Sequence, residues 1–159
     1  MTDLTPDELR SHRENVLLRL LLRVAQLETA ELTERLQVRG HASVQAGWIS
    51  LLGNVDTEGT RIVAIADRMG TTRQAVSQRV QAIERAGYLE RVADPDDRRG
   101  VLVRHTKQGS ALLTAALEVM GEIEVGYGEV LGRARLRALK EALKDIAESV
   151  PSDSALGRG

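Results

Sequence analysis

Residues 62–89 read IVAIADRMGTTRQAVSQRVQAIERAGYL, and the pattern in this stretch decides the fold. Apolar residues recur at helical spacing as far as Met69, and Gly70 follows them as a typical helix C-terminal stop. Either Thr71 or Thr72 is placed to cap a second helix with its hydroxyl group. Two helices joined by a tight turn that contains glycine predict a helix-turn-helix.

The second helix of this pair carries almost no acid on its outward side, because Glu84 comes only near its end. Val76, Val80 and Ile83 are expected to face inward. An ordinary solvated helix face mixes acids with bases, whereas hydroxyl, amide and guanidinium groups pair with DNA bases and phosphates. A merely soluble surface is the alternative. The residues expected at DNA in this region are Thr71, Thr72, Arg73, Gln74, Ser77 and Gln78.

The chain next carries DPDDRRG, residues 94–100, between two runs of β-forming residues. Aspartate and proline start turns, and the final glycine is expected to give the backbone freedom to return, so the segment predicts a hairpin tip. Arg98 and Arg99 are expected to point outward, since a narrow minor groove attracts guanidinium groups. We hypothesise that Asp94 or Asp97 turns back and holds an arginine extended. An idle charged turn is the alternative.

Outside this region the pattern predicts a mainly α chain with one small β-hairpin. The stretch before residue 40 has no glycine, and its apolar band is too wide for one buried face. A helix this apolar in a small chain often packs against a second copy of itself. The predicted helices cover residues 6–39, 43–52, 62–69, 71–86, 107 onward and 133–148, with two strands between 88 and 104.

Composition excludes several classes of protein. The 159 residues suit one domain with helical additions, and the absence of cysteine excludes a disulfide framework and thiolate metal sites. No apolar run approaches the roughly 18 residues that span a bilayer, and the polar N-terminus is unlike a secretory signal, so the cytoplasm is the expected location. Residues 61–107 hold ten Lys or Arg against six Asp or Glu, within a chain of net charge −1. A basic middle between acidic flanks suits a polyanion-binding module.

Three features together resemble the multiple antibiotic resistance regulator (MarR) family of bacterial transcription factors. They are MGTTRQAVSQRVQAIERAGYLER at residues 69–91, DPDDRRGVLVRHTKQG at residues 94–109, and the long helices around them. The second is the specific one, since the family pattern is a D-P-x-D-x-R-like tip, an apolar strand and then T-x-x-G. The resemblance implies a winged-helix homodimer that binds an inverted-repeat operator in double-stranded DNA. It places the second helix in the major groove and Arg99, flanked by Arg98, in the minor groove.

The resemblance also implies how the chain is divided. Residues 1–40 and 107–150 would form the dimerisation region, residues 41–106 the winged helix, and residues 151–159 a flexible tail. Family members are commonly repressors, and many release DNA when a small effector, often aromatic or phenolic, binds between the two regions. Candidates for such an effector site are His12, His41 and Trp48.

Several positions depart from the family pattern. Arg79 stands where the family usually has an apolar residue, and it would contact DNA, pair with an acid or line a ligand cavity. His105 replaces a usual leucine at the end of the second strand. Trp48 suits simple core packing as well as an effector site. The glycines of the long helix after the wing would bend it, admit a partner helix or fray it; they are Gly121, Gly126 and Gly128.

The motifs of enzymes are missing from the sequence. There is no nucleophile elbow, glycine-rich phosphate loop or HExxH spacing, and three scattered histidines do not make a metal site. We therefore expect no catalysis, no metal and no cofactor. The alternative function is a winged helix used only for protein contacts. Such domains tend to lose basic residues of the kind kept here at Arg73, Arg98 and Arg99.

Overall fold

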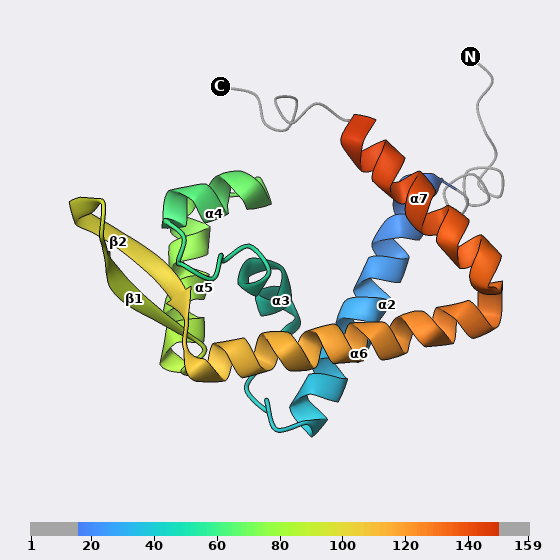
Figure 1. Ribbon diagram of the computed structural model, residues 1–159, viewed down its shortest axis with the longest axis horizontal. Helices are drawn as coiled ribbons and strands as arrows, with labels where there is room; N and C mark the ends of the chain where they lie inside the picture. The colour runs from blue at the N-terminus through green and yellow to red at the C-terminus, as the bar shows by residue number, and fades with distance from the viewer. Residues whose placement is uncertain (1–15, 150–159) are drawn as a thin grey trace, which may run out of the picture.

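The structure is a computed structural model that describes residues 16–149, except for the side chain of Arg98. It confirms a mainly α chain with one β-hairpin. In Figure 1, α3, α4, α5 and the hairpin gather at one end of α6, α2 crosses α6, and α7 folds back from the other end. The elements are α2 (Leu17–Val38), α3 (Ala46–Leu52), α4 (Ile62–Met69), α5 (Arg73–Arg85), β1 (Leu89–Asp94), β2 (Asp97–His105), α6 (Lys107–Leu131) and α7 (Arg133–Ser149).

The helix-turn-helix of α4 and α5 is built around the inward face of α5. Val76, Val80 and Ile83 are fully buried, as their spacing predicts. They belong to one hydrophobic cluster with Leu51 of α3 and Ile65 of α4. Burying an apolar side chain of this size stabilises a fold by about 1.5–3 kcal/mol. The core therefore fixes the orientation of α5 and leaves its polar face to solvent.

The turn between α4 and α5 has the geometry that the sequence predicts. Gly70 adopts left-handed backbone, with φ 59° and ψ 39°, which favours glycine. The hydroxyl of Thr72, rather than that of Thr71, caps α5 by accepting a hydrogen bond from the Ala75 N–H at 3.2 Å. The first turn of α5 is thereby held in the position from which its exposed side chains project.

The T-x-x-G sequence joins the hairpin to α6. Thr106 accepts a hydrogen bond from the Gly109 N–H at 3.0 Å, and its own hydroxyl donates to the Gly87 carbonyl at 2.6 Å. The Thr106 N–H donates to the Tyr88 carbonyl at 3.1 Å. Gly109 packs directly against that carbonyl and leaves no room for a Cβ atom. The end of α5, the hairpin and the start of α6 are therefore locked together.

One predicted helix is interrupted, and one predicted helix start is wrong. The helix predicted over residues 6–39 is not continuous, because Val16 has extended backbone (φ −70°, ψ 128°) and α2 begins at Leu17. The part of that prediction before residue 16 lies outside the described residues. The next helix begins at Ala46 rather than at residue 43, because Gln45 is also extended (φ −117°, ψ 147°).

The glycines of α6 do not interrupt it. The helix continues through Gly121 and Gly126, both of which have open space where a Cβ atom would stand. The chain turns instead at Gly132, whose φ is 78°. Among the helices within residues 16–149, none is both long and apolar enough to cross a membrane.

His105 fills the junction between the hairpin and α3. Its Nε2 lies 3.3 Å from the Val55 carbonyl oxygen, and its Nδ1 is buried without a hydrogen-bond partner. Burial lowers the pKa of this imidazole below its ordinary value of 6.5, and the hydrogen bonds to backbone carbonyls oppose that change. The folded protein therefore holds His105 neutral at a pH where the unfolded chain begins to protonate it.

We expect the free energy of unfolding to fall as the pH drops below about 6.5, toward the lower pKa of folded His105. Above that pH the contribution is complete, because the imidazole is neutral in both states. The measurement is urea unfolding of the wild type and of His105→Leu between pH 7.5 and 5, before carboxylates begin to titrate. Equal pH dependence in the two proteins would contradict the assignment.

Candidate nucleic-acid interface

The outward face of α5 is polar and accessible. Arg73, Gln74 and Gln78 are exposed, while Ser77 is half-buried. Thr72 is exposed at the N-cap, and because its oxygen accepts the capping bond its O–H can still donate to an outside acceptor. The structure thus brings five of the six predicted DNA-contacting residues of this region onto one helix and its cap. The sixth, Thr71, lies half-buried in the turn just before them.

The single acid of α5 is neutralised within the winged unit. Glu84 receives a hydrogen bond from Arg91 of β1 at 3.2 Å. No other carboxylate projects from α5. As the sequence predicts, α5 therefore presents no unpaired carboxylate at any point along its length.

The arginines of the winged unit divide into two groups. Within residues 42–106, leaving Arg98 aside, four arginines lie within 4 Å of a carboxylate, and they are Arg61, Arg68, Arg91 and Arg104. Four others have no carboxylate partner among the described residues, and they are Arg73, Arg79, Arg85 and Arg99. The unpaired group consists of every arginine of α5 and the described arginine of the wing tip. No described carboxylate neutralises these cations, so they are available to an anion outside the chain.

Arg79 is one of two arginines that flank the buried stripe of α5. Arg73 lies three residues before Val76 and Arg79 three residues after it, so at 3.6 residues per turn they fall on opposite sides of that stripe. Arg79 is exposed and has no acidic partner in the described chain. Of the three roles that the sequence leaves open for this residue, ion pairing with an acid is thus not observed.

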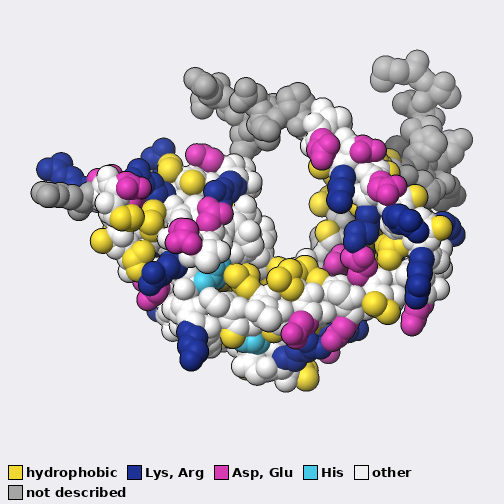
Figure 2. Space-filling view, in the orientation of Figure 1, with side chains coloured by type: hydrophobic (Ala, Val, Ile, Leu, Met, Phe, Trp, Pro, Cys, Tyr) yellow, Lys and Arg dark blue, Asp and Glu magenta, His cyan; other side chains and the backbone are white. Residues whose placement is uncertain are grey.

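The wing is an antiparallel hairpin whose strands reach further toward the tip than the sequence predicts. The register pairs Asp94 with Asp97, leaving Pro95 and Asp96 as the turn. A register shift next to Asp94 accommodates the extra residues of β2. Arg99 is exposed on β2, and the backbone of Arg98 lies beside it in the same strand. Figure 2 shows Lys and Arg side chains near the outer end of the hairpin.

The acids of the tip hold a different arginine from the ones expected. The Asp94 carboxylate accepts a hydrogen bond from Arg61 Nε at 2.7 Å, and Arg61 comes from the N-cap of α4. The carboxylate of Asp97 accepts a hydrogen bond from the backbone N–H of Arg99 at 3.0 Å and lies 3.6 Å from the Arg61 guanidinium. Backbone donation from Asp96 and then the Arg61 contact lower the pKa of Asp94.

Gly100 is needed for close approach rather than for backbone freedom. Its φ is not positive, so the conformation is open to any residue. A Cβ atom at this position would lie 2.8 Å from the Cβ of Asp94 and 3.1 Å from that of Asp97. Gly100 therefore lets the two acids pack against the backbone of β2. The sequence predicted instead that this glycine serves the turn.

Two of the three effector candidates meet around Tyr88. The ring centroids of His41 and Trp48 lie 5.8 and 6.3 Å from that of Tyr88. Trp48 is buried in the core and also lines a surface groove of about 670 Å³, together with Ser43, Gln45 and Arg85. His12 lies outside the described residues. Figure 2 shows a separate hollow between the winged unit and α7, with hydrophobic side chains along its floor.

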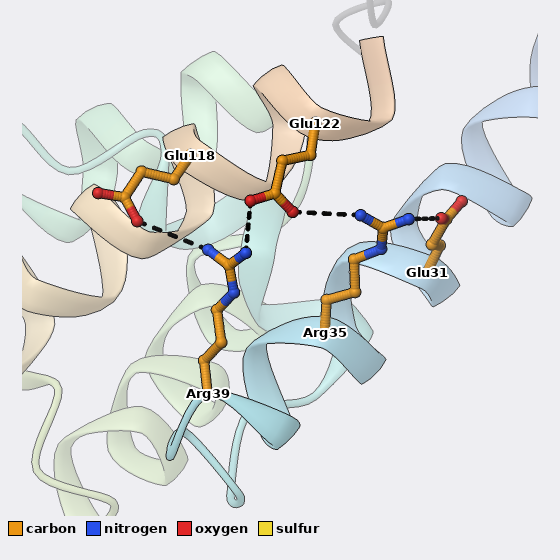
Figure 3. Close-up of polar contacts among 5 residues, drawn as sticks. All are labelled: Glu31, Arg35, Arg39, Glu118 and Glu122. Atoms are coloured by element: carbon orange, nitrogen blue, oxygen red, sulfur yellow. Dashed lines mark hydrogen bonds and ion pairs between the residues drawn. The ribbon is translucent and has the colours of Figure 1, made fainter. Parts of the chain in front are cut away.

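An ionic network that sequence reasoning missed ties α2 to α6 (Figure 3). Arg39 contacts Glu118 at 3.5 Å and Glu122 at 2.5 Å, and Arg35 joins Glu122 at 3.2 Å to Glu31. The hydrogen bond from Arg39 is the main cause that lowers the pKa of Glu122. These pairs are partly exposed, so each contributes modestly, but together they fix how the scaffold helices cross.

The scaffold also exposes a large apolar surface. Exposed leucines and valines follow the first half of α2, including Leu20 and Leu27. The helix α7 is amphipathic, yet none of its residues is buried. A face of adjacent exposed apolar side chains is typical of an interaction site.

Sequence comparison agrees with this geometry. Residues 42–100 match the model of the MarR family. A curated relative, "Uncharacterized HTH-type transcriptional regulator YdcH" of Bacillus subtilis (strain 168), is 33% identical over 76 residues, which cover 46% of this chain and 52% of that protein. The chain spans about half the length of this relative. Residues 42–100 are thus similar to the winged helix of MarR-type regulators, as the sequence motifs predict.

Two solved structures share the fold over most of both chains. A mutant MarR from E. coli complexed with operator DNA has a TM-score of 0.66 and 23% identity, and the match covers 82% of this chain and 92% of that chain. CouR from Rhodococcus jostii RHA1 bound to p-coumaroyl-CoA has a TM-score of 0.67 and 23% identity, covering 87% and 96%. At this identity the likeness establishes the fold alone.

Proposed function

We propose that the protein is a cytoplasmic, homodimeric transcriptional repressor that occupies an inverted-repeat operator, because residues 42–100 match the model of the MarR family. The observation that carries the proposal is the division of the arginines. Those of α5 and Arg99 of the wing tip have no carboxylate partner among the described residues, whereas the other described arginines of the winged unit are paired. A surface that keeps its cations unpaired is suited to phosphate.

In this proposal α5 enters the major groove and the wing follows the adjacent minor groove. Gln74 and Gln78 project from the outward face and have the amide groups that read adenine. Thr71, Thr72, Arg73 and Ser77 would contact bases or nearby phosphates, and Arg99 with Arg98 would enter the minor groove. The operator complex of the E. coli relative supports this arrangement by analogy of fold.

A second copy of the chain would cover the exposed apolar faces of α2 and α7. A twofold dimer presents two copies of α5 to two half-sites, with centres about 10 base pairs apart. Residues 1–40 and 107–150 would then form the dimerisation region, and residues 41–106 the DNA-binding unit.

A small aromatic or phenolic effector would bind where the two regions meet. Trp48 and His41, which gather around Tyr88, are the described candidates for its contacts. The complex of CouR with p-coumaroyl-CoA supports an aromatic acyl ligand as the first class to test. Loss of operator binding on addition of such a compound would be the expected response.

The function is tested by selecting bound fragments of the source genome with the purified protein. We expect an inverted repeat, and an affinity that falls about 10³- to 10⁵-fold between 50 and 200 mM salt if some 6–10 phosphates are contacted. A flat salt response would instead favour the second candidate, a winged helix that binds only proteins.

Arg79→Ala is expected to weaken binding equally for all operator variants, because phosphate contacts carry no sequence information. The slope of log affinity against log salt should fall in magnitude by about one for each phosphate that the variant no longer touches. Fluorescence anisotropy over a salt series measures both. The control is Arg104→Ala, which removes an exposed arginine already paired with Glu90 at 2.7 Å and should leave the slope unchanged. A weakening confined to some operator variants would place Arg79 at a base.

A further inference from the structure

Arg61 connects the first helix of the helix-turn-helix to the tip of the wing. It occupies the N-cap of α4, directly after Thr60. The backbone N–H and carbonyl of Thr60 pair with Val103 of β2 at 2.8 and 2.9 Å. From this anchored position the Arg61 side chain extends to Asp94 at the other end of the hairpin.

We propose that Arg61 is a positioning residue that holds the wing at a fixed angle to α5, so that Arg99 is aligned with the minor groove before DNA arrives. This inference rests on the proposed DNA-binding function. We call Arg61, Asp94, Asp97 and Gly100 the wing clamp.

The clamp is closely fitted at its acidic end. The Asp94 side chain is only 5% exposed, and Arg61 contacts it through Nε at 2.7 Å and through a terminal guanidinium nitrogen at 2.5 Å. The second oxygen of Asp94 accepts the backbone N–H of Asp96 at 3.0 Å. Asp97 lies 3.6 Å from the same guanidinium, and Gly100 leaves space for both acids. A buried carboxylate with all of these partners specifies one arrangement of the tip.

The clamp explains why a tip that faces DNA carries so many acids. A free Asp94 would repel phosphate, but here its charge is matched by Arg61 and withdrawn from the surface. Asp97 in turn accepts the backbone N–H of Arg99 and so fixes the backbone from which that side chain projects. The acids therefore stiffen the tip.

Fixing the tip in advance matters because a hairpin held only at its base loses conformational freedom when it docks. Thr60 attaches the wing toward its base, at Val103, and Arg61 attaches it at the tip. Both residues continue into α4, which packs against α5. The distance between the wing tip and the recognition surface of α5 is then set by the core of the helix-turn-helix.

The first test compares Arg61→Gln with the matched control Arg68→Gln. Both residues lie at the ends of α4 and form a close ion pair with an aspartate, and their side chains are 49% and 44% exposed. Only Arg61 touches the wing. The probe is the tightest-binding duplex recovered by genomic selection, in versions with A·T-rich or G·C-rich flanks beneath the wing. We expect Arg61→Gln to bind roughly tenfold more weakly and to lose preference for A·T flanks, and Arg68→Gln to keep that preference.

The second test repeats Arg61→Gln in the Arg99→Ala background. If Arg61 acts through the wing arginine, removing Arg61 should cause little further loss of affinity once Arg99 is absent. Affinity losses that simply add would overturn the clamp and place Arg61 itself on phosphate. Asp94→Asn should also weaken binding; tighter binding by that variant would mean that the acid only repels DNA.

A DNA-independent measurement separates this inference from the proposed function. The N–H groups of Asp96 and Arg99 donate to clamp carboxylates, so their hydrogen exchange should accelerate in Arg61→Gln while amides of the core of α5 keep their rates. Unchanged exchange at the tip would refute the clamp even if the protein binds DNA. Failure of the wild type to bind any duplex would refute the proposed function and leave the exchange result to decide the clamp.

Discussion

Gly109→Ala is expected to destabilise the protein by more than about 3 kcal/mol, or to prevent folding. A Cβ atom at this position would overlap the Tyr88 carbonyl oxygen, which already accepts the Thr106 N–H. The clash is with backbone in the locked junction between α5 and α6, so neither side can move away without breaking hydrogen bonds. Overpacking in a tight site typically costs about 1–3 kcal/mol, and a backbone clash costs more.

The measurement is the free energy of unfolding from urea denaturation, with Gly121→Ala as the control. Gly121 lies in the same helix but has nothing within 4 Å of a Cβ position. Alanine there should stabilise α6 by up to about 1 kcal/mol, since glycine is the poorer helix former. A mild effect of Gly109→Ala, similar to that of its control, would show that the junction is looser than the contacts imply.

The double variant Leu20→Asp, Leu27→Asp is expected to convert the protein to a monomer and to lower operator affinity by about 10²- to 10⁴-fold. The two leucines are seven residues apart on one face of α2, with 46% and 61% of their surface exposed. Charge on this face would have to be buried without a partner in the proposed dimer. A monomer binds one half-site and loses the advantage of linked binding.

Analytical ultracentrifugation and anisotropy on the selected operator measure the two effects. Val38→Asp is the matched control, since it adds the same kind of charge to the same helix at an 83% exposed position near the other end. It should leave the dimer intact. A Leu20→Asp, Leu27→Asp protein that remains dimeric would show that another surface joins the copies.

The sequence determined the parts of this protein that depend on near neighbours along the chain. The glycine stop at Gly70, the cap at Thr72 and the buried stripe of Val76, Val80 and Ile83 all follow from interactions within about four residues. The hairpin followed from a short turn between two β-forming runs. These local signals were sufficient to predict the winged helix and the polar face of α5.

Only the tertiary structure decided which charges meet. Arg61 and Asp94 are 33 residues apart, and Arg35 and Glu122 are 87 apart, so no local pattern pairs them. The sequence places several acids at the wing tip without showing their partner. The tertiary structure brings Arg61, at the start of α4, to these acids. The same packing leaves Arg79 without an acidic partner among residues 16–149. A long charged side chain can reach any of several partners. The fold determines which of them lies close enough to form an ion pair.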